Sequence, residues 1–246
     1  MARITIVDES VTFEEPTLVE GFPGVGLVGK ITVDHLIDTY GMDLYANIHC
    51  EGFPRVTRYH ESSSTLTTPV RLYADEDSDL IALQSDVPVN PGAAAEFADC
   101  IAGWFAEESV LPIYLSGLPH EKSERLPELS GVAVGSAADR LSAVDINKPP
   151  ESGIVSGPTG AMLADALERD APAIGLVVES DPQFPDPEAA RTLIVDGIDP
   201  IAGTSTDVDG LVEKATEIKE AKQQFAKRME QATEESSQAE PLKMYQ

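Results

Sequence analysis

The sequence has few cysteines and no long apolar run. Its 246 residues contain two cysteines, Cys50 and Cys100, which lie far apart and form no C-x-x-C pair. This spacing predicts neither a disulfide framework nor a zinc site. No stretch approaches the roughly 18 apolar residues that a membrane-spanning helix needs. The N-terminus lacks the charged and then apolar layout of a secretion signal, so we expect a cytoplasmic protein.

Basic residues are also scarce. Lys and Arg number 17 against 43 Asp and Glu, which gives a formal net charge of −26. A body this acidic repels phosphate backbones and anionic headgroups, so the charge argues against nucleic acid and membrane surfaces as partners. The carboxylates are dispersed along the chain. Such a distribution is typical of a surface adapted to high salt, because at about 1 M salt charges are screened beyond roughly 3 Å.

Apolar residues make up 42% of the chain, which is enough for a sizeable core. Short β-type runs alternate with helix-type stretches. This alternation predicts an α/β fold, a three-layer α/β/α sandwich with a mostly parallel central sheet. The expected strands are 3–7, 17–20, 44–50, 69–73, 80–84, 111–115, 131–134 and 173–178. The expected helices are 26–40, one that opens at Asn90, 159–167 and 187–195.

The composition changes near residue 209. We therefore expect an α/β domain over 1–208, an amphipathic helix over 209–233 and a flexible tail over 234–246. Apolar positions in the helix alternate in steps of four and three, which is a heptad seam with one polar break. The seam comprises Leu211, Ala215, Ile218, Lys222, Phe225, Met229 and Ala232. The helix either packs against its own copies or lies on the domain; we favour self-association into a homo-oligomer.

A glycine-rich stretch lies between an expected strand and an expected helix. Residues 24–29 match G-x-G-x-x-G, and Lys30 almost completes a Walker A loop, but Ile31 stands where Ser or Thr would reach magnesium. A strand-to-helix turn also needs small residues wherever backbones approach closely. We favour a structural turn or a subunit-contact loop. The alternative is a phosphate- or nucleotide-binding enzyme of nucleoside-phosphorylase or ligase type that uses the turn from Gly24 to Gly29.

Two further segments carry polar residues next to expected helices. Residues 156–160 are either an anion-binding turn or a plain helix cap supplied by Thr159, and we favour the cap. Asp181, Asp186 and Glu188 follow the strand at 173–178, where α/β ligand sites gather, but the intervening prolines favour a rigid loop. The histidines at 35, 49, 60 and 120 have no metal-ligand spacing. We expect no catalytic residue, no metal and no cofactor.

The extreme C-terminus is apolar again after a polar stretch. Met244-Tyr245-Gln246 is a hydrophobe-Tyr-any sequence on an expected flexible linker. Tyr supplies apolar area and a hydroxyl, and a terminal carboxylate can meet a lysine, so such an end can dock on a partner.

Three elements of the chain resemble the archaeal branch of the proteasome assembly chaperone family. They are E-G-F-P-G-V-G-L-V-G at 20–29, Ser156-Gly157 and P-D-P-E-A-A at 185–190. The resemblance covers roughly residues 15–200. It implies an α/β/α domain related in shape to nucleoside phosphorylases and carboxylate-amine ligases, without an established catalytic centre. It also implies assembly with its own kind and binding to α subunits of the proteasome core particle.

Some members of that family carry a C-terminal hydrophobe-Tyr-any tail that inserts between α-ring subunits. Met244, Tyr245 and Gln246 match this tail position for position. The resemblance therefore implies that these three residues bind the partner. We expect a non-enzymatic assembly chaperone or activator-like protein.

Overall fold

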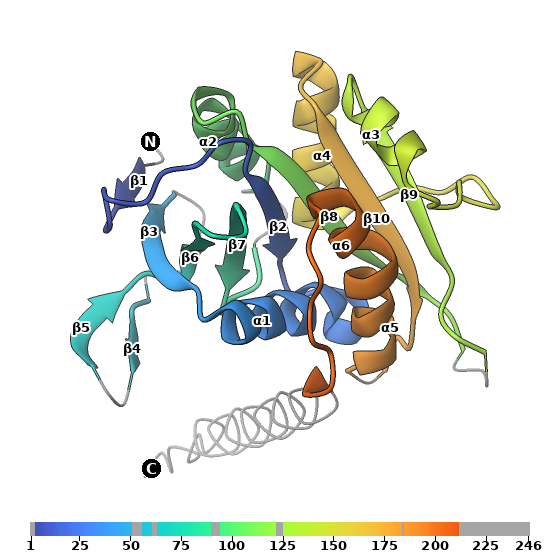
Figure 1. Ribbon diagram of the computed structural model, residues 1–246, viewed down its shortest axis with the longest axis horizontal. Coiled ribbons are helices and arrows are strands. Elements are labelled where there is room, and N and C mark those ends of the chain that lie inside the picture. Colours follow the sequence, from blue (N-terminus) through green and yellow to red (C-terminus); the bar gives the residue numbers. More distant parts are fainter. Residues whose placement is uncertain are drawn as a thin grey trace, which may run out of the picture.

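The computed structural model describes residues 3–50, 56–60, 63–89, 94–121, 125–183 and 185–211. The expected helix over 209–233 from residue 212 onward, the expected tail over 234–246 and the expected start of a helix at Asn90 lie outside these residues. The helix expected to follow Asn90 is present as α2 Ala94–Glu107. The described part contains an eight-stranded mixed sheet with helices packed on it (Figure 1).

The strands of the sheet lie in the order β1-β3-β6-β7-β2-β8-β10-β9. Their bounds are β1 Arg3–Ile6, β2 Thr17–Gly21, β3 Asp43–His49, β6 Val70–Asp75, β7 Leu80–Ser85, β8 Leu111–Pro119, β9 Leu129–Val134 and β10 Ala173–Ser180. The expected strands are therefore present with ends that differ by a few residues. Sequence analysis missed β4 Arg58–His60 and β5 Ser63–Thr67, which pair with each other outside the main sheet.

The expectation of a mostly parallel sheet is wrong. β7, β2, β8 and β10 run parallel to one another, but β1, β3, β6 and β9 pair antiparallel with their neighbours. For β6 and β7 the cause is the connection between them, because only four residues separate Asp75 from Leu80. Short connections of this kind join antiparallel strands, whereas a parallel pair needs a long crossover.

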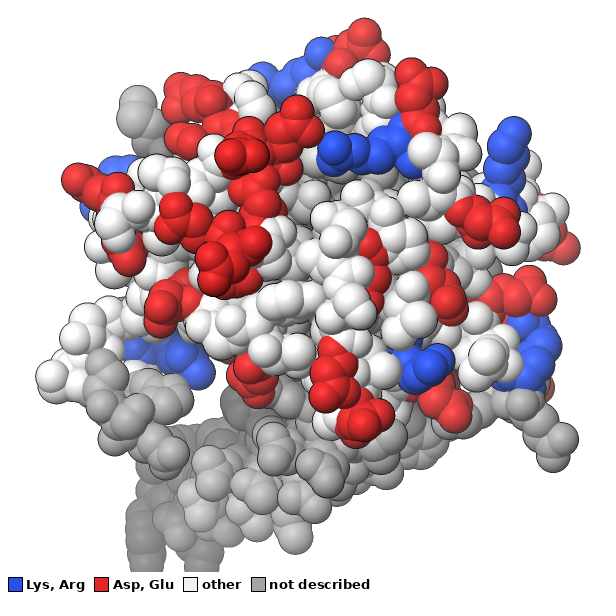
Figure 2. Space-filling model, viewed as in Figure 1, with Lys and Arg blue, Asp and Glu red and all other residues white. Residues whose placement is uncertain are grey.

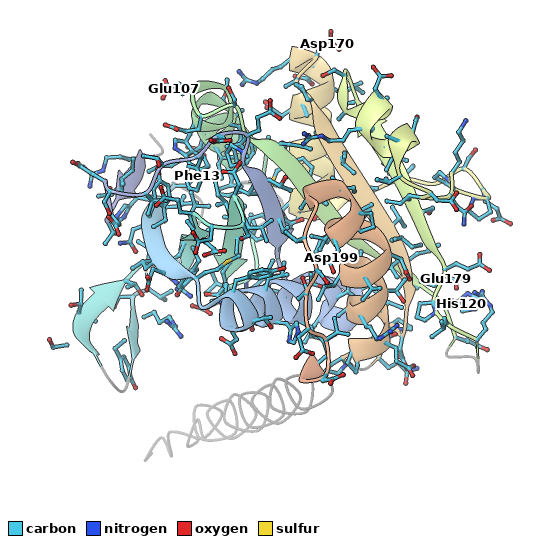
Figure 3. All side chains as sticks on the ribbon, in the orientation of Figure 1. Phe13, Glu107, His120, Asp170, Glu179 and Asp199 are labelled. Atoms are coloured by element: carbon cyan, nitrogen blue, oxygen red, sulfur yellow. The ribbon has the colours of Figure 1, made fainter. Side chains whose placement is uncertain are left out.

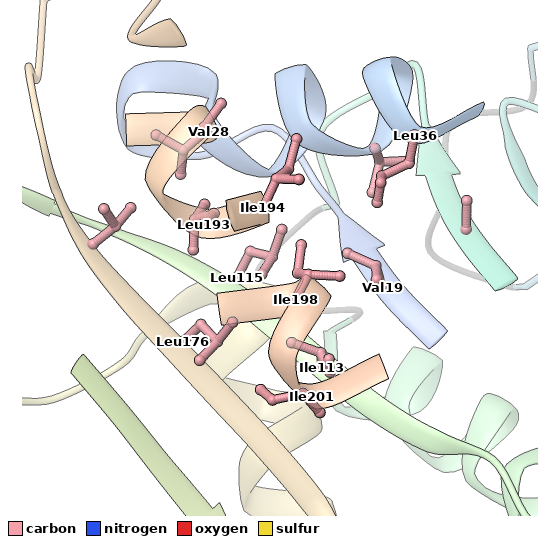
Figure 4. Close-up of a cluster of buried hydrophobic side chains, with 14 of the residues drawn as sticks. Val19, Val28, Leu36, Ile113, Leu115, Leu176, Leu193, Ile194, Ile198 and Ile201 are labelled. Carbon is pink, nitrogen blue, oxygen red and sulfur yellow. The ribbon is translucent and has the colours of Figure 1, made fainter. Parts of the chain in front are cut away.

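Helices cover both faces of the sheet (Figure 1). One face carries α1 Val28–Tyr40, α3 Ala137–Ala143, α5 Pro187–Thr192, the π-helix Leu193–Ile198 and α6 Asp199–Ala202; the other carries α2 Ala94–Glu107 and α4 Gly157–Arg169. Adjacent residues of β2 alternate between the two cores. Val19 belongs to the α1 side (Figure 4) and Leu18 to the α2 side, as the period of two in a strand requires.

Carboxylates spread over the visible face of the molecule and do not gather on one element (Figure 2). This agrees with the dispersed acidic residues of the sequence. Among the described residues, no helix has the length and apolar content needed to cross a membrane.

Candidate functional site

The carboxyl ends of β7, β2, β8 and β10 share one edge of the sheet, which is where ligand sites gather in α/β folds. The glycine-rich stretch follows β2 at this edge. It forms a short 3₁₀ turn, Val25–Leu27, and then enters α1 at Val28. The predicted placement of the glycine-rich stretch between a strand and a helix is therefore confirmed.

Two of the three glycines in this stretch serve close packing. Gly26 has φ of 61°, and a Cβ added there would lie 1.8 Å from the Ser180 Oγ at the end of β10. The Gly26 carbonyl accepts a hydrogen bond from the Asp186 N–H at 2.9 Å. A Cβ on Gly29 would lie 3.1 Å from the Phe22 carbonyl oxygen. A positive φ and contact with Ser180 therefore explain Gly26, and the close approach of a backbone carbonyl explains Gly29, whereas a Cβ on Gly24 would have no atom within 4 Å.

Glu20, in β2, is a buried carboxylate beside this turn. Its Oε1 accepts a hydrogen bond from the Phe22 N–H at 2.7 Å, and its Oε2 accepts from the Leu115 N–H at 3.2 Å and the Thr159 hydroxyl at 3.1 Å. Burial raises the pKa of Glu20 from 4.5 to about 7, although all three hydrogen bonds oppose the rise. The sequence signal for this group is one acid in an otherwise apolar strand, and sequence analysis assigned it no role.

Glu20 also explains the segment at 156–160. The helix α4 begins at Gly157 with Ser156 at the N-cap position, so the expectation that Thr159 is the cap is wrong. Thr159 lies inside the first turn and its hydroxyl donates to Glu20. Where an anion-binding turn would hold its ligand, the Thr159 hydroxyl therefore donates to a carboxylate of the protein itself. A phosphate placed beside it would meet a group that becomes negative near neutral pH, which disfavours anion binding there.

The acidic residues after β10 have structural partners. Asp186 caps α5: its carboxylate accepts from the Ala189 N–H at 3.1 Å and the Asp181 N–H at 3.0 Å. The Asp181 carboxylate in turn accepts from the Gln183 N–H at 2.8 Å. Both carboxylates therefore have hydrogen-bond partners within the loop and at the start of α5, and Pro187 opens α5 as expected.

A small cleft lies next to this loop. It measures about 20 Å³, which is space for about one water molecule. His120 and Glu179 lie together at its edge (Figure 3), with Nδ1 and a carboxylate oxygen 3.4 Å apart. Arg125 contacts the same carboxylate at 2.7 Å and holds the pKa of Glu179 below its usual value. In the described part of the chain, no three His, Cys, Asp or Glu side chains gather as metal ligands.

Lys30, the residue that almost completes a Walker A loop, belongs to a polar network under α1. Its ammonium lies 2.9 Å from the Asp34 carboxylate, which also accepts a hydrogen bond from the Gln84 amide at 2.6 Å. The fully buried Arg71 of β6 donates to Gln84 and, at 2.7 Å, to Asp86. Sequence analysis missed this network, although an arginine within an apolar strand signals a buried ion pair.

A hollow of about 500 Å³ opens on the other helical face, between α2 and α4. Its lining is mostly apolar and includes Tyr114 and Met162. Burial raises the pKa of Tyr114. At its rim, the Arg169 guanidinium contacts Asp165 at 2.9 Å and also contacts Asp99. Hollows of this size and polarity accept apolar groups of a ligand or partner.

The predicted partner-binding residues Met244, Tyr245 and Gln246 lie outside the described residues. The expected C-terminal helix is described only at its start. There, Leu211 is 1% exposed and belongs to the core between α1 and the sheet. The first position of the heptad seam therefore packs on its own domain.

Comparison with known proteins gives one family. The model of the PAC2 family matches residues 18–226. An uncharacterized protein of Methanocaldococcus jannaschii is 27% identical over 232 residues, which span 92% of this chain and 93% of the relative.

Solved structures show the same fold. PbaA of Pyrococcus furiosus, an archaeal homolog of proteasome-assembly chaperone, superposes with a TM-score of 0.78 at 23% identity, over 95% of this chain and all of that one. PbaB of the same organism, an archaeal proteasome activator, superposes with a TM-score of 0.69 at 22% identity, over 92% and 98% of the two chains.

Proposed function

Because the chain belongs to the PAC2 family, we propose that it is a non-enzymatic assembly chaperone or activator-like protein that binds α subunits of the proteasome core particle. Met244, Tyr245 and Gln246 are the residues that enter the α ring. The observation that carries the proposal is this C-terminal hydrophobe-Tyr-any sequence on a chain whose fold matches a proteasome-assembly chaperone homolog and a proteasome activator.

The sheet edge supports a binding protein over an enzyme. At the position where an α/β enzyme holds its ligand, Glu20 accepts hydrogen bonds from two backbone N–H groups and Thr159. The glycine turn is in contact with Ser180, and Lys30 is paired with Asp34. The Lys30 ammonium and the Thr159 hydroxyl, which the phosphate-binding alternative would use, are thus engaged within the chain.

The proposed mechanism relies on several copies of a weak contact. A tail of three residues binds weakly by itself, but tails joined to one scaffold bind with a raised effective concentration. The expected helix over 209–233 supplies self-association, and the expected linker over 234–241 lets each tail reach its own pocket. The buried Leu211 gives this segment a fixed origin on the domain.

The experiment is a pull-down of purified archaeal core particle at high salt. The full chain is compared with a chain that lacks residues 244–246, and the oligomeric state of both is measured by size-exclusion chromatography with light scattering. We expect the truncated chain to lose the core particle while keeping the same oligomeric state. Equal recovery of core particle by both chains would refute the tail mechanism.

A further inference from the structure

The fold brings the two cysteines of the chain together. Cys50 directly follows β3, and Cys100 lies in the middle of α2. Both are half-buried thiols, and their side chains are in hydrogen-bonding contact. The sequence gives no sign of this contact, because neither residue belongs to a cysteine motif.

Packing of the surrounding core fixes this approach. Cys50 packs against the apolar cluster to which α2 contributes, and β3 meets α2 through the Tyr45 and Trp104 rings, whose centroids are 6.1 Å apart. Cys100 lies one helical turn before Trp104 and so shares its face of α2. The two thiols therefore extend from elements that are already held against each other.

We propose that Cys50 and Cys100 are a modification site, at which thiol–disulfide exchange with a low-molecular-weight disulfide forms a reversible intramolecular disulfide. The bond would tie the end of β3 to α2. It would also close a loop that contains β6 and β7, two central strands of the sheet.

The exchange balances with one molecule of the small disulfide. The Cys50 thiolate attacks a sulfur of the small disulfide, and one small thiolate leaves. The Cys100 sulfur then attacks the Cys50 sulfur of the mixed disulfide, and the second small thiolate leaves. The two protons of the cysteines end on the two small thiols, so the protein is oxidised and the small disulfide is reduced.

The order of attack follows from the environment of the Cys100 sulfur. Burial, and then the neighbouring Cys50, raise the pKa of Cys100 to about 12, so little Cys100 thiolate is available for attack on an external disulfide. Within the mixed disulfide the reaction is intramolecular, and the high effective concentration of Cys100 offsets its small thiolate fraction.

The test uses the intact chain under native conditions. Wild type is incubated with oxidised glutathione, unfolded in denaturant with iodoacetamide and analysed by intact mass, peptide mapping and non-reducing electrophoresis. Under these denaturing, non-reducing conditions we expect chains that are not linked to one another, have lost both alkylatable thiols and yield one peptide pair linked through Cys50 and Cys100. Dithiothreitol should reverse the change. Closure of this loop should raise Tm by about 8 °C or more.

Three results would overturn the proposal: both thiols remain alkylatable, glutathione stays attached to either cysteine, or the bond joins two chains.

The matched control is the double variant Asp99→Cys/Cys100→Ser. It moves the thiol by one residue, about 100° around the helix, to a side chain that is 75% exposed. The loop length is almost unchanged, so we expect oxidation at least about tenfold slower than in wild type. Equal rates would contradict the role of the native contact.

Discussion

The carboxylate of Glu20, in β2, accepts a hydrogen bond from the hydroxyl of Thr159, in α4, at 3.1 Å. Both side chains are buried, and they come from segments that lie 139 positions apart in the sequence. The bond places an ionisable group inside the sheet edge where a ligand would otherwise lie. Its protonation therefore links the stability of the domain to pH.

We expect the domain to lose stability as Glu20 ionises. Burial raises the pKa of Glu20 from 4.5 to about 7, so the folded chain holds this proton more tightly than the unfolded chain does. The contribution is fully present below pH 4.5 and is lost as pH rises to about 7. Relative to Glu20→Gln, which does not titrate, wild type should lose about 3 kcal/mol of unfolding free energy over this range.

Urea unfolding of wild type and Glu20→Gln at pH 5 and pH 8, at constant salt, measures this difference. Using the difference between the two proteins cancels the titration of the many surface carboxylates. A difference in unfolding free energy that does not change between the two pH values would contradict the raised pKa.

The strands were predictable because each is a short apolar run. Part of the antiparallel pairing was also predictable, from the length of the connections between strands. Four residues separate β6 from β7, too few for a crossover helix, and such a short connection is itself a signal for antiparallel neighbours. The hairpin β4–β5 was missed because it carries exposed apolar side chains such as Tyr59, so it lacks the alternation of a half-buried strand. Contacts such as Glu20 with Thr159, or Cys50 with Cys100, depend on tertiary packing and have no local signal.

Gly26 should not tolerate a side chain. Its φ is 61°, and a Cβ would lie 1.8 Å from the Ser180 Oγ. We expect Gly26→Ala to destabilise the domain by about 2–4 kcal/mol, from backbone strain and overpacking together. Removal of the Ser180 hydroxyl by Ser180→Ala in the same chain should recover part of the loss.

Gly24→Ala is the matched control, because its φ is −137° and a Cβ there would have no atom within 4 Å. We expect its unfolding free energy to stay within about 0.5 kcal/mol of wild type. If chemical denaturation gave equal losses for the Gly24 and Gly26 variants, contact with Ser180 would not be the reason for the glycine at position 26.

Arg71 and Arg58 contact the same oxygen of Asp86 from different environments. Arg71 is fully buried and lies at 2.7 Å, whereas Arg58 lies at 3.4 Å with 37% of its side chain exposed. We expect Arg71→Met to cost about 3–5 kcal/mol, because it leaves Gln84 and Asp86 without their buried donor. Arg58→Met should cost at most about 1 kcal/mol. Urea unfolding of the two variants measures these losses. Similar losses of unfolding free energy would contradict the different roles of the two arginines.

Nucleotides, nucleosides and inorganic phosphate should not stabilise the protein. The cleft at the sheet edge has a volume of about 20 Å³. The Leu115 N–H and the Thr159 hydroxyl already donate to the Glu20 carboxylate. We expect Tm to be unchanged at millimolar ligand relative to chloride of the same ionic strength, measured at high salt. A ligand that raises Tm in wild type but not in Lys30→Ala would favour the enzyme alternative.

The most direct test of the account is equilibrium binding of the full chain to immobilised core particle. Wild type is compared with Tyr245→Ala and with Tyr59→Ala, which removes a tyrosine that is 80% exposed on β4. The account predicts that Tyr245→Ala weakens binding by at least about tenfold while Tyr59→Ala binds like wild type. Equal affinity of wild type and Tyr245→Ala would contradict it.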